Sequence, residues 1–139
     1  MKQDALFNMV EQQIRPWDVH NPEILKSLHD FPRMDFLPTD LKPYAYMDVE
    51  LPLSINGQNT HTKLMPPRLL ALIAYFSRTV TAFELDERIM QFAQDNLNHA
   101  NVRNINYELT DGLKASTTKF DVLVLAGSIT QLTPARLNK

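Results

Sequence analysis

The sequence predicts an α/β fold in which a helical N-terminal region precedes an incomplete parallel sheet. The second half of the chain runs through strand, helix, strand and strand patterns in turn, which is typical of a doubly wound parallel sheet. The first third instead shows helical spacing of apolar residues, interrupted by prolines. The 139 residues suit one domain, with residues 1–66 as the helical and irregular part and residues 67–139 as the partial sheet core.

Two helices are predicted near the N-terminus. Residues 4–14 carry apolar side chains at helical spacing, and we expect this helix to end at Arg15, because a residue that precedes a proline avoids the α region. A second helix begins at Asn21-Pro22, with Asn21 as its N-cap, and stops near residue 31.

Prolines dominate the next stretch, residues 31–67, which contains six of the nine in the chain. We therefore expect it to be largely irregular, with short extended pieces at 47–53. The elements expected after it are a buried helix at 67–76, a strand at 79–85, a helix capped by Asp86 that reaches residue 99, strands at 104–109 and 120–126, and a short helix from Thr133. The nearly continuous apolar run of 120–126 suits a strand that is covered on both faces.

Composition and charge exclude several classes of protein. The net charge of −2 gives no general affinity for nucleic acid or for an anionic membrane. No apolar run reaches the roughly 18 residues of a membrane span, and the N-terminus lacks the apolar segment of a signal peptide, so we expect a cytoplasmic protein. The chain has no cysteine, and its four histidines share no metal-like spacing, so no metal site is predicted.

Several stretches of the chain are similar to one known family. They are residues 9–19 (MVEQQIRPWDV), the PR-x-x-F-x-P pattern at 32–38, residues 45–48 (AYMD) and residues 51–53 (LPL). In order and spacing they resemble bacterial protein-L-isoaspartate O-methyltransferases. The resemblance implies a Rossmann-like methyltransferase fold that takes S-adenosylmethionine as cofactor and methylates isoaspartyl carboxylates of damaged proteins or peptides.

The resemblance also implies roles for individual residues. Glu84 falls where the family's acid for the ribose hydroxyls stands, at the carboxyl end of a parallel strand. Asp111 and Gly112 match the family's G-D-G turn near the adenine, with Thr110 in place of the first glycine. Gly127 and Ser128 match the substrate-facing loop. Each acid also has an ordinary interpretation, as a solvated residue near a strand end or as part of a common turn.

Two features depart from the family. A central strand and the glycine-rich loop after it are expected between residues 76 and 79, where only Ser77 and Arg78 stand, and no glycine lies between Gly57 and Gly112. Glycine allows a cofactor to approach the backbone where a Cβ would clash, so its absence argues against donor binding. The family's active-site serine is also absent from the loop corresponding to 56–66, where only Thr60 or Thr62 offers a hydroxyl.

Loss of a central strand leaves backbone N–H and C=O groups without hydrogen-bond partners on both neighbouring strands. We expect the strands at 79–85 and 120–126 to pair directly, another segment such as 47–54 to fill the gap, or a second copy of the chain to supply a strand. The sequence therefore leaves two functions open. One is an impaired or inactive methyltransferase. The other is a non-catalytic binding or assembly module, one form of which is a strand-exchanged homo-oligomer.

Overall fold

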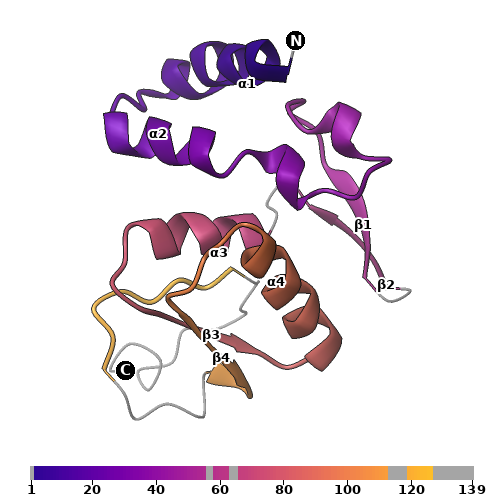
Figure 1. The fold of residues 1–139 in the computed structure, drawn as a ribbon, viewed down its shortest axis with the longest axis vertical. Helices are drawn as coiled ribbons and strands as arrows, with labels where there is room; N and C mark the ends of the chain where they lie inside the picture. The colour runs from indigo at the N-terminus through magenta and orange to yellow at the C-terminus, as the bar shows by residue number, and fades with distance from the viewer. Residues whose placement is uncertain (1, 56–57, 63–65, 113–118, 127–139) are drawn as a thin grey trace.

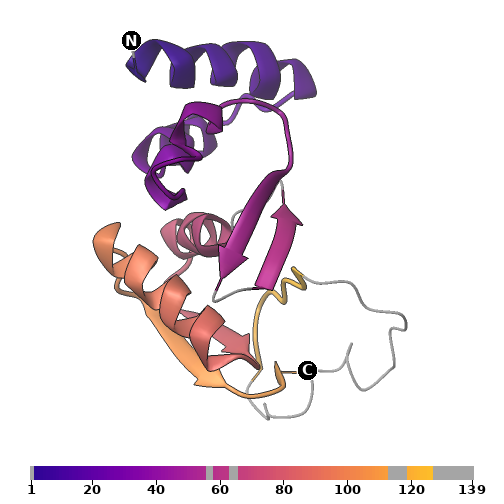
Figure 2. The same cartoon turned by 90° about the vertical axis from the view of Figure 1, so that its right-hand side faces the viewer.

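The computed structural model describes residues 2–55, 58–62, 66–112 and 119–126. It is a mixed helix and strand structure with two separate two-stranded sheets. In Figure 1 the two N-terminal helices lie together at one end of the molecule, and the β1–β2 hairpin lies at one side of the molecule. The helices α3 and α4 lie with the β3–β4 sheet at the other end. Figure 2 shows the same arrangement from the side.

The N-terminal helix continues further than the sequence predicts. Helix α1 (Lys2–Met9) passes into a π-helical turn (Val10–Ile14) and then into a 3-10 turn (Arg15–Trp17), and the chain leaves it at Asp18 with φ 63°. The expectation that Arg15 avoids the α region is wrong, since its φ is −59° and its ψ is −37°. The Arg15 N–H donates to the carbonyl of Val10. Pro16 lies in the first positions of the 3-10 turn, where its missing N–H costs no hydrogen bond.

Helix α2 (Pro22–Asp30) begins where the sequence predicts. The Asn21 side chain accepts hydrogen bonds from the backbone N–H groups of Glu23 and Ile24, at 2.9 and 3.2 Å. These bonds satisfy two of the donors that a helix leaves unpaired at its start.

The proline-rich stretch is more ordered than we expect from its composition. It contains 3-10 turns at Arg33–Phe36 and Lys42–Tyr44 and an antiparallel pair of strands, β1 (Leu51–Ile55) and β2 (Gln58–Thr62). The extended piece expected at 47–53 begins four residues later, and β2 is not foreseen. The Asn56-Gly57 pair between the strands is a dipeptide typical of two-residue hairpin connections, and this signal was available in the sequence.

The second half follows the expected order as far as residue 109. Helix α3 (Pro66–Tyr75) leads to β3 (Val80–Glu84), and helix α4 (Glu87–His99) connects β3 to β4 (Ile105–Leu109). The two strands are parallel, with Val80 opposite Ile105 and Glu84 opposite Leu109. Helices α3 and α4 pack against each other and both contact the sheet. This strand–helix–strand unit is the part of an α/β fold that the structure contains.

The strand expected at 120–126 is not formed. This segment has no regular secondary structure and no ladder pairing, and Val122 is 76% exposed while Leu123 and Val124 are each 50% exposed. The expectation of a strand covered on both faces is therefore wrong. A strand needs a neighbour with which its backbone can pair. The family resemblance assigns a central strand to the position next to β3, but no described residues form a strand there.

Segment 47–54 does not fill that position either. Strand β1 pairs with β2 in a sheet of its own, so the second edge of β3 has no strand partner in the part of the chain that the structure describes.

One apolar core joins the two halves of the chain. Its buried members are Phe36, Leu37, Ala45, Leu51, Ala71 and Leu97. A second cluster, made of Leu6, Met9, Val10 and Leu25, holds α1 against α2. Tyr46 packs against both clusters. Within the described ranges, no helix is long and apolar enough to span a membrane.

Candidate functional site

The carboxyl edge of the β3–β4 sheet brings together two of the residues singled out in the sequence. Glu84 is the last residue of β3, and its register partner Leu109 is the last residue of β4. Asp111 follows Leu109 by two residues, so both acids stand at the same edge of the sheet. In parallel sheets this edge is where ligands bind. It is the candidate site of the chain.

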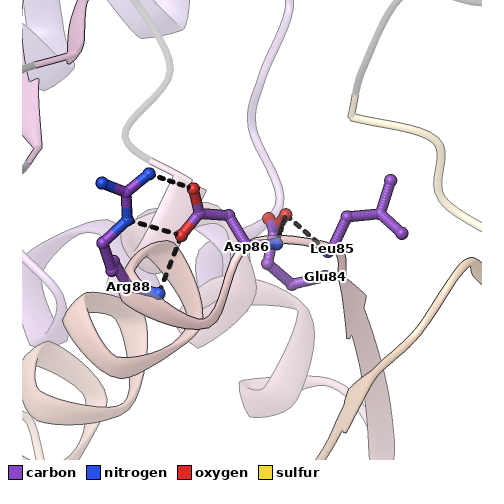
Figure 3. A network of polar contacts seen from close by, with 4 residues as sticks. All are labelled: Glu84, Leu85, Asp86 and Arg88. Carbon is purple, nitrogen blue, oxygen red and sulfur yellow. Dashed lines mark hydrogen bonds and ion pairs between the residues drawn. The ribbon is translucent and has the colours of Figure 1, made fainter.

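The Glu84 carboxylate already has partners in its own backbone. Its Oε1 accepts a hydrogen bond from the N–H of Leu85 at 2.7 Å and one from the N–H of Asp86 at 3.1 Å (Figure 3). These bonds shape the turn that leads from β3 into α4. A structural role is therefore visible for Glu84 beside the ribose-binding role that the family resemblance implies.

Asp86 caps helix α4 as the sequence predicts. Its Oδ1 accepts from the backbone N–H of Arg88 at 2.8 Å, and the Arg88 guanidinium pairs with Oδ2 at 2.7 Å (Figure 3). The hydrogen bonds from the Arg88 side chain and backbone lower the pKa of Asp86 to about 2. The carboxylate therefore stays ionised at the positive end of the helix dipole at any pH near neutral.

Gly112 is required by packing. A Cβ at this position would lie 2.7 Å from Cγ of Phe83 and 2.8 Å from its Cβ, distances that real Cβ atoms do not tolerate. The Phe83 ring is in turn held edge-on by Phe120, with ring centroids 6.2 Å apart. The close approach of Phe83 explains a glycine here without a cofactor.

The other sequence candidates stand apart from this edge or beyond the description. Thr60 and Thr62 belong to β2, opposite Leu53 and Leu51, in a separate sheet. Gly127 and Ser128 lie outside the described residues. Among the residues that are described, no three His, Asp or Glu side chains gather as metal ligands do.

The connection from α3 to β3 decides how well a methyl donor fits. Helix α3 ends at Tyr75, and β3 begins at Val80, so Phe76 to Thr79 is all that joins them. Asn104 closes this connection, since its Nδ2 donates to the carbonyl oxygens of Ala74 and Ser77, each at 2.9 Å. Glu84 and Asp111 stand where the family resemblance implies contacts with the sugar and base of S-adenosylmethionine, but the described residues of this edge contain no glycine turn between α3 and β3 for its amino-acid portion. The residues present do not fit the whole cofactor.

Comparison with known proteins gives partial matches. No family model matches the chain. A protein-L-isoaspartate O-methyltransferase of Herpetosiphon aurantiacus is 38% identical over 66 residues, which cover 48% of this chain and 27% of the relative. A protein of the same name from Petrotoga mobilis is 26% identical over 145 residues, covering 86% of this chain and 68% of the relative. The match thus spans about a quarter of the length of the first relative and about two thirds of the second.

Proposed function

We propose that this chain is a protein-L-isoaspartate O-methyltransferase relative that no longer transfers methyl groups in this form. By descent its substrates are isoaspartyl sites in damaged proteins or peptides, and its cofactor is S-adenosylmethionine. The two similar proteins carry that name. The parallel β3–β4 pair, with Glu84 and Asp111 at its carboxyl edge, supports the same origin.

The observation that carries the loss of activity is the short connection between Tyr75 and Val80, closed by Asn104. Methyl transfer to a carboxylate needs no protein nucleophile and depends on holding two partners in line, so a missing donor site removes most of the mechanism. The Petrotoga alignment adds support. Its 145 positions exceed the 139 residues of this chain, so part of the relative has no counterpart here.

Calorimetry with S-adenosylmethionine tests this proposal directly. We expect no measurable binding heat and no transfer of labelled methyl groups to an isoaspartyl peptide, under conditions in which an active family member transfers them. Micromolar affinity together with transfer would overturn the loss of activity. Glu84→Gln would then report on the family role of Glu84, because removal of its charge should weaken ribose binding without removing the side chain.

A second candidate is an assembly module that pairs through the open edge of β3. The Val80 N–H donates to the Asn104 carbonyl at 2.9 Å, which means that the even-numbered residues of β3 direct their backbone groups to β4. The N–H and C=O groups of Thr81 and Phe83 therefore point to the other edge. Among the described residues this row has no strand partner, and such a row is a template for another strand.

In such an assembly a second copy would pair with this edge in a two-fold antiparallel arrangement centred on Ala82. Thr81 then pairs with the partner subunit's Phe83 and exchanges two backbone hydrogen bonds with it, in agreement with the direction of the unpaired groups.

Light scattering separates the two states. Pairing predicts a mass of twice the 16.0 kDa of one chain. Thr81→Pro removes an N–H from the open edge while leaving the β3–β4 ladder intact, so it should return the mass to one chain, whereas Thr81→Val should keep the pair. A single-chain mass for the unmodified protein at every concentration tested would exclude the assembly.

A further inference from the structure

Arg33, from the PR-x-x-F-x-P pattern, is buried with part of its guanidinium unsatisfied. The residue is only 8% exposed. Its Nη1 donates to the carbonyl of Met47 at 3.2 Å and its Nη2 to that of Val49 at 3.5 Å, which holds the chain ahead of β1. Its Nε is buried and has no hydrogen-bond partner. A buried donor without an acceptor destabilises the folded protein, so a ligand atom that accepts a hydrogen bond from this Nε would be stabilising.

A second arginine, Arg68, lies nearby and also has a buried nitrogen without a hydrogen-bond partner. Arg68 is a half-buried residue in the first turn of α3, and its Nε donates to the carbonyl of Phe31 at 2.8 Å. Its Nη2 is buried and unpartnered. The start of α3 packs near the 3-10 turn that carries Arg33. The positive end of the helix dipole adds to the two charges there.

No described carboxylate forms an ion pair with either arginine. Burial lowers the pKa of Arg68, and the charge of Arg33 lowers it further, to about 10, while Tyr46 opposes this shift. Burial also lowers the pKa of Arg33, against the influence of Asp48. Burial raises the pKa of Tyr46, and the charge of Asp35 raises it further. At neutral pH the site thus holds two positive charges that repel each other, with the negative charge of Asp48 acting on Arg33.

We propose that Arg33 and Arg68 form a binding site for a small oxyanion, a carboxylate or a phosphate group. The guanidinium fork matches both groups, and each arginine offers an unused buried N–H. Arg68 as a residue is half-buried whereas its unpartnered Nη2 is buried, so binding requires that the Arg68 side chain moves to open the pair to the solvent. The site is separate from the β3–β4 edge and does not depend on methyl transfer.

Thermal unfolding in low concentrations of anion, at constant ionic strength with chloride as the reference, tests the site. We expect inorganic phosphate or acetate to raise the Tm with increasing concentration, as a ligand of the folded state does. The larger of the two responses identifies the group that the site prefers. Equal Tm values in chloride, phosphate and acetate would overturn the proposal.

Arg68→Met separates binding from a structural role. It removes one charge of the repelling pair together with the hydrogen bond to the Phe31 carbonyl, so the decisive readout is phosphate affinity by calorimetry, which should fall at least about tenfold. Arg103→Gln, at an exposed arginine bonded to Asn98, should leave affinity unchanged. A lower Tm in every buffer with undiminished phosphate affinity in Arg68→Met would assign both arginines to structure alone.

Discussion

The side-chain amide of Asn104 lies 2.9 Å from the carbonyl oxygen of Ser77 and donates a hydrogen bond to it. The same amide bonds to Ala74, and the Asn104 carbonyl accepts from the Val80 N–H at 2.9 Å. Asn104, the residue just before β4, therefore bonds to both ends of the connection between α3 and β3. The family resemblance implies a strand and a glycine loop at this connection, and Asn104 binds the short chain that stands there instead.

Asn104→Ala should lower the free energy of unfolding by about 1–3 kcal/mol, because two carbonyl groups lose their donor. Urea unfolding measures the change. The control is Asn106→Ala, at an exposed residue of the same strand, which should cost much less. Equal losses in the two variants would contradict the role of Asn104.

Gly112→Ala should also destabilise the protein, by about 1–3 kcal/mol, since the new Cβ would meet the Phe83 side chain at 2.7 Å. The loss should shrink in a Phe83→Ala background, where the obstructing ring is absent. A double-mutant cycle by urea unfolding measures this coupling. If the two changes add without coupling, the contact with Phe83 is not the reason for the glycine.

Asn21→Ala should cost about 1 kcal/mol, because the first turn of α2 loses the acceptor of two backbone N–H groups. Asn8→Ala, within α1 and exposed, should leave the stability unchanged or slightly raise it, since alanine is the better helix former. Thermal unfolding of both variants checks the prediction. A loss in Asn8→Ala as large as in Asn21→Ala would argue against capping.

Asp86 should make stability depend on pH in the acid range. Its pKa in the folded protein is about 2, below the ordinary value of 3.8, so its contribution is complete above pH 3.8 and is lost as the pH falls towards 2. Asp86→Asn retains a capping oxygen but does not titrate. Its Tm should therefore fall less between pH 4 and pH 2 than that of the unmodified protein. Parallel pH profiles for the two proteins would refute the assignment.

Local chemistry explains which elements were predictable. Asn21 with Pro22 and Asp86 with Arg88 are capping signals contained within a few residues, and both helices begin where these signals stand. The strands at 79–85 and 104–109 alternate with a helix, and the structure pairs them in parallel as that order implies. The positions of Glu84 and Asp111 at one sheet edge follow from the same pattern.

The remaining features depend on partners far away in the chain. Residues 120–126 have the composition of a buried strand, but β character is realised only when a neighbour pairs with it, and the described structure offers none. Arg33 reads as part of a motif, yet its role comes from carbonyls 14 and 16 residues later and from Arg68. Gly112 reads as a cofactor turn, whereas Phe83 requires it.

By itself, the sequence determined the helix starts, the parallel pair and the likeness to isoaspartyl methyltransferases, because caps and hydrophobic periods act over short distances. Only the tertiary structure decided that β3 has an open edge among the described residues, that Asn104 binds the connection before it, and that two arginines lie close together, each with a buried N–H that lacks a partner. Those outcomes depend on which backbone and side-chain groups find partners in space, and spacing along the chain does not encode that.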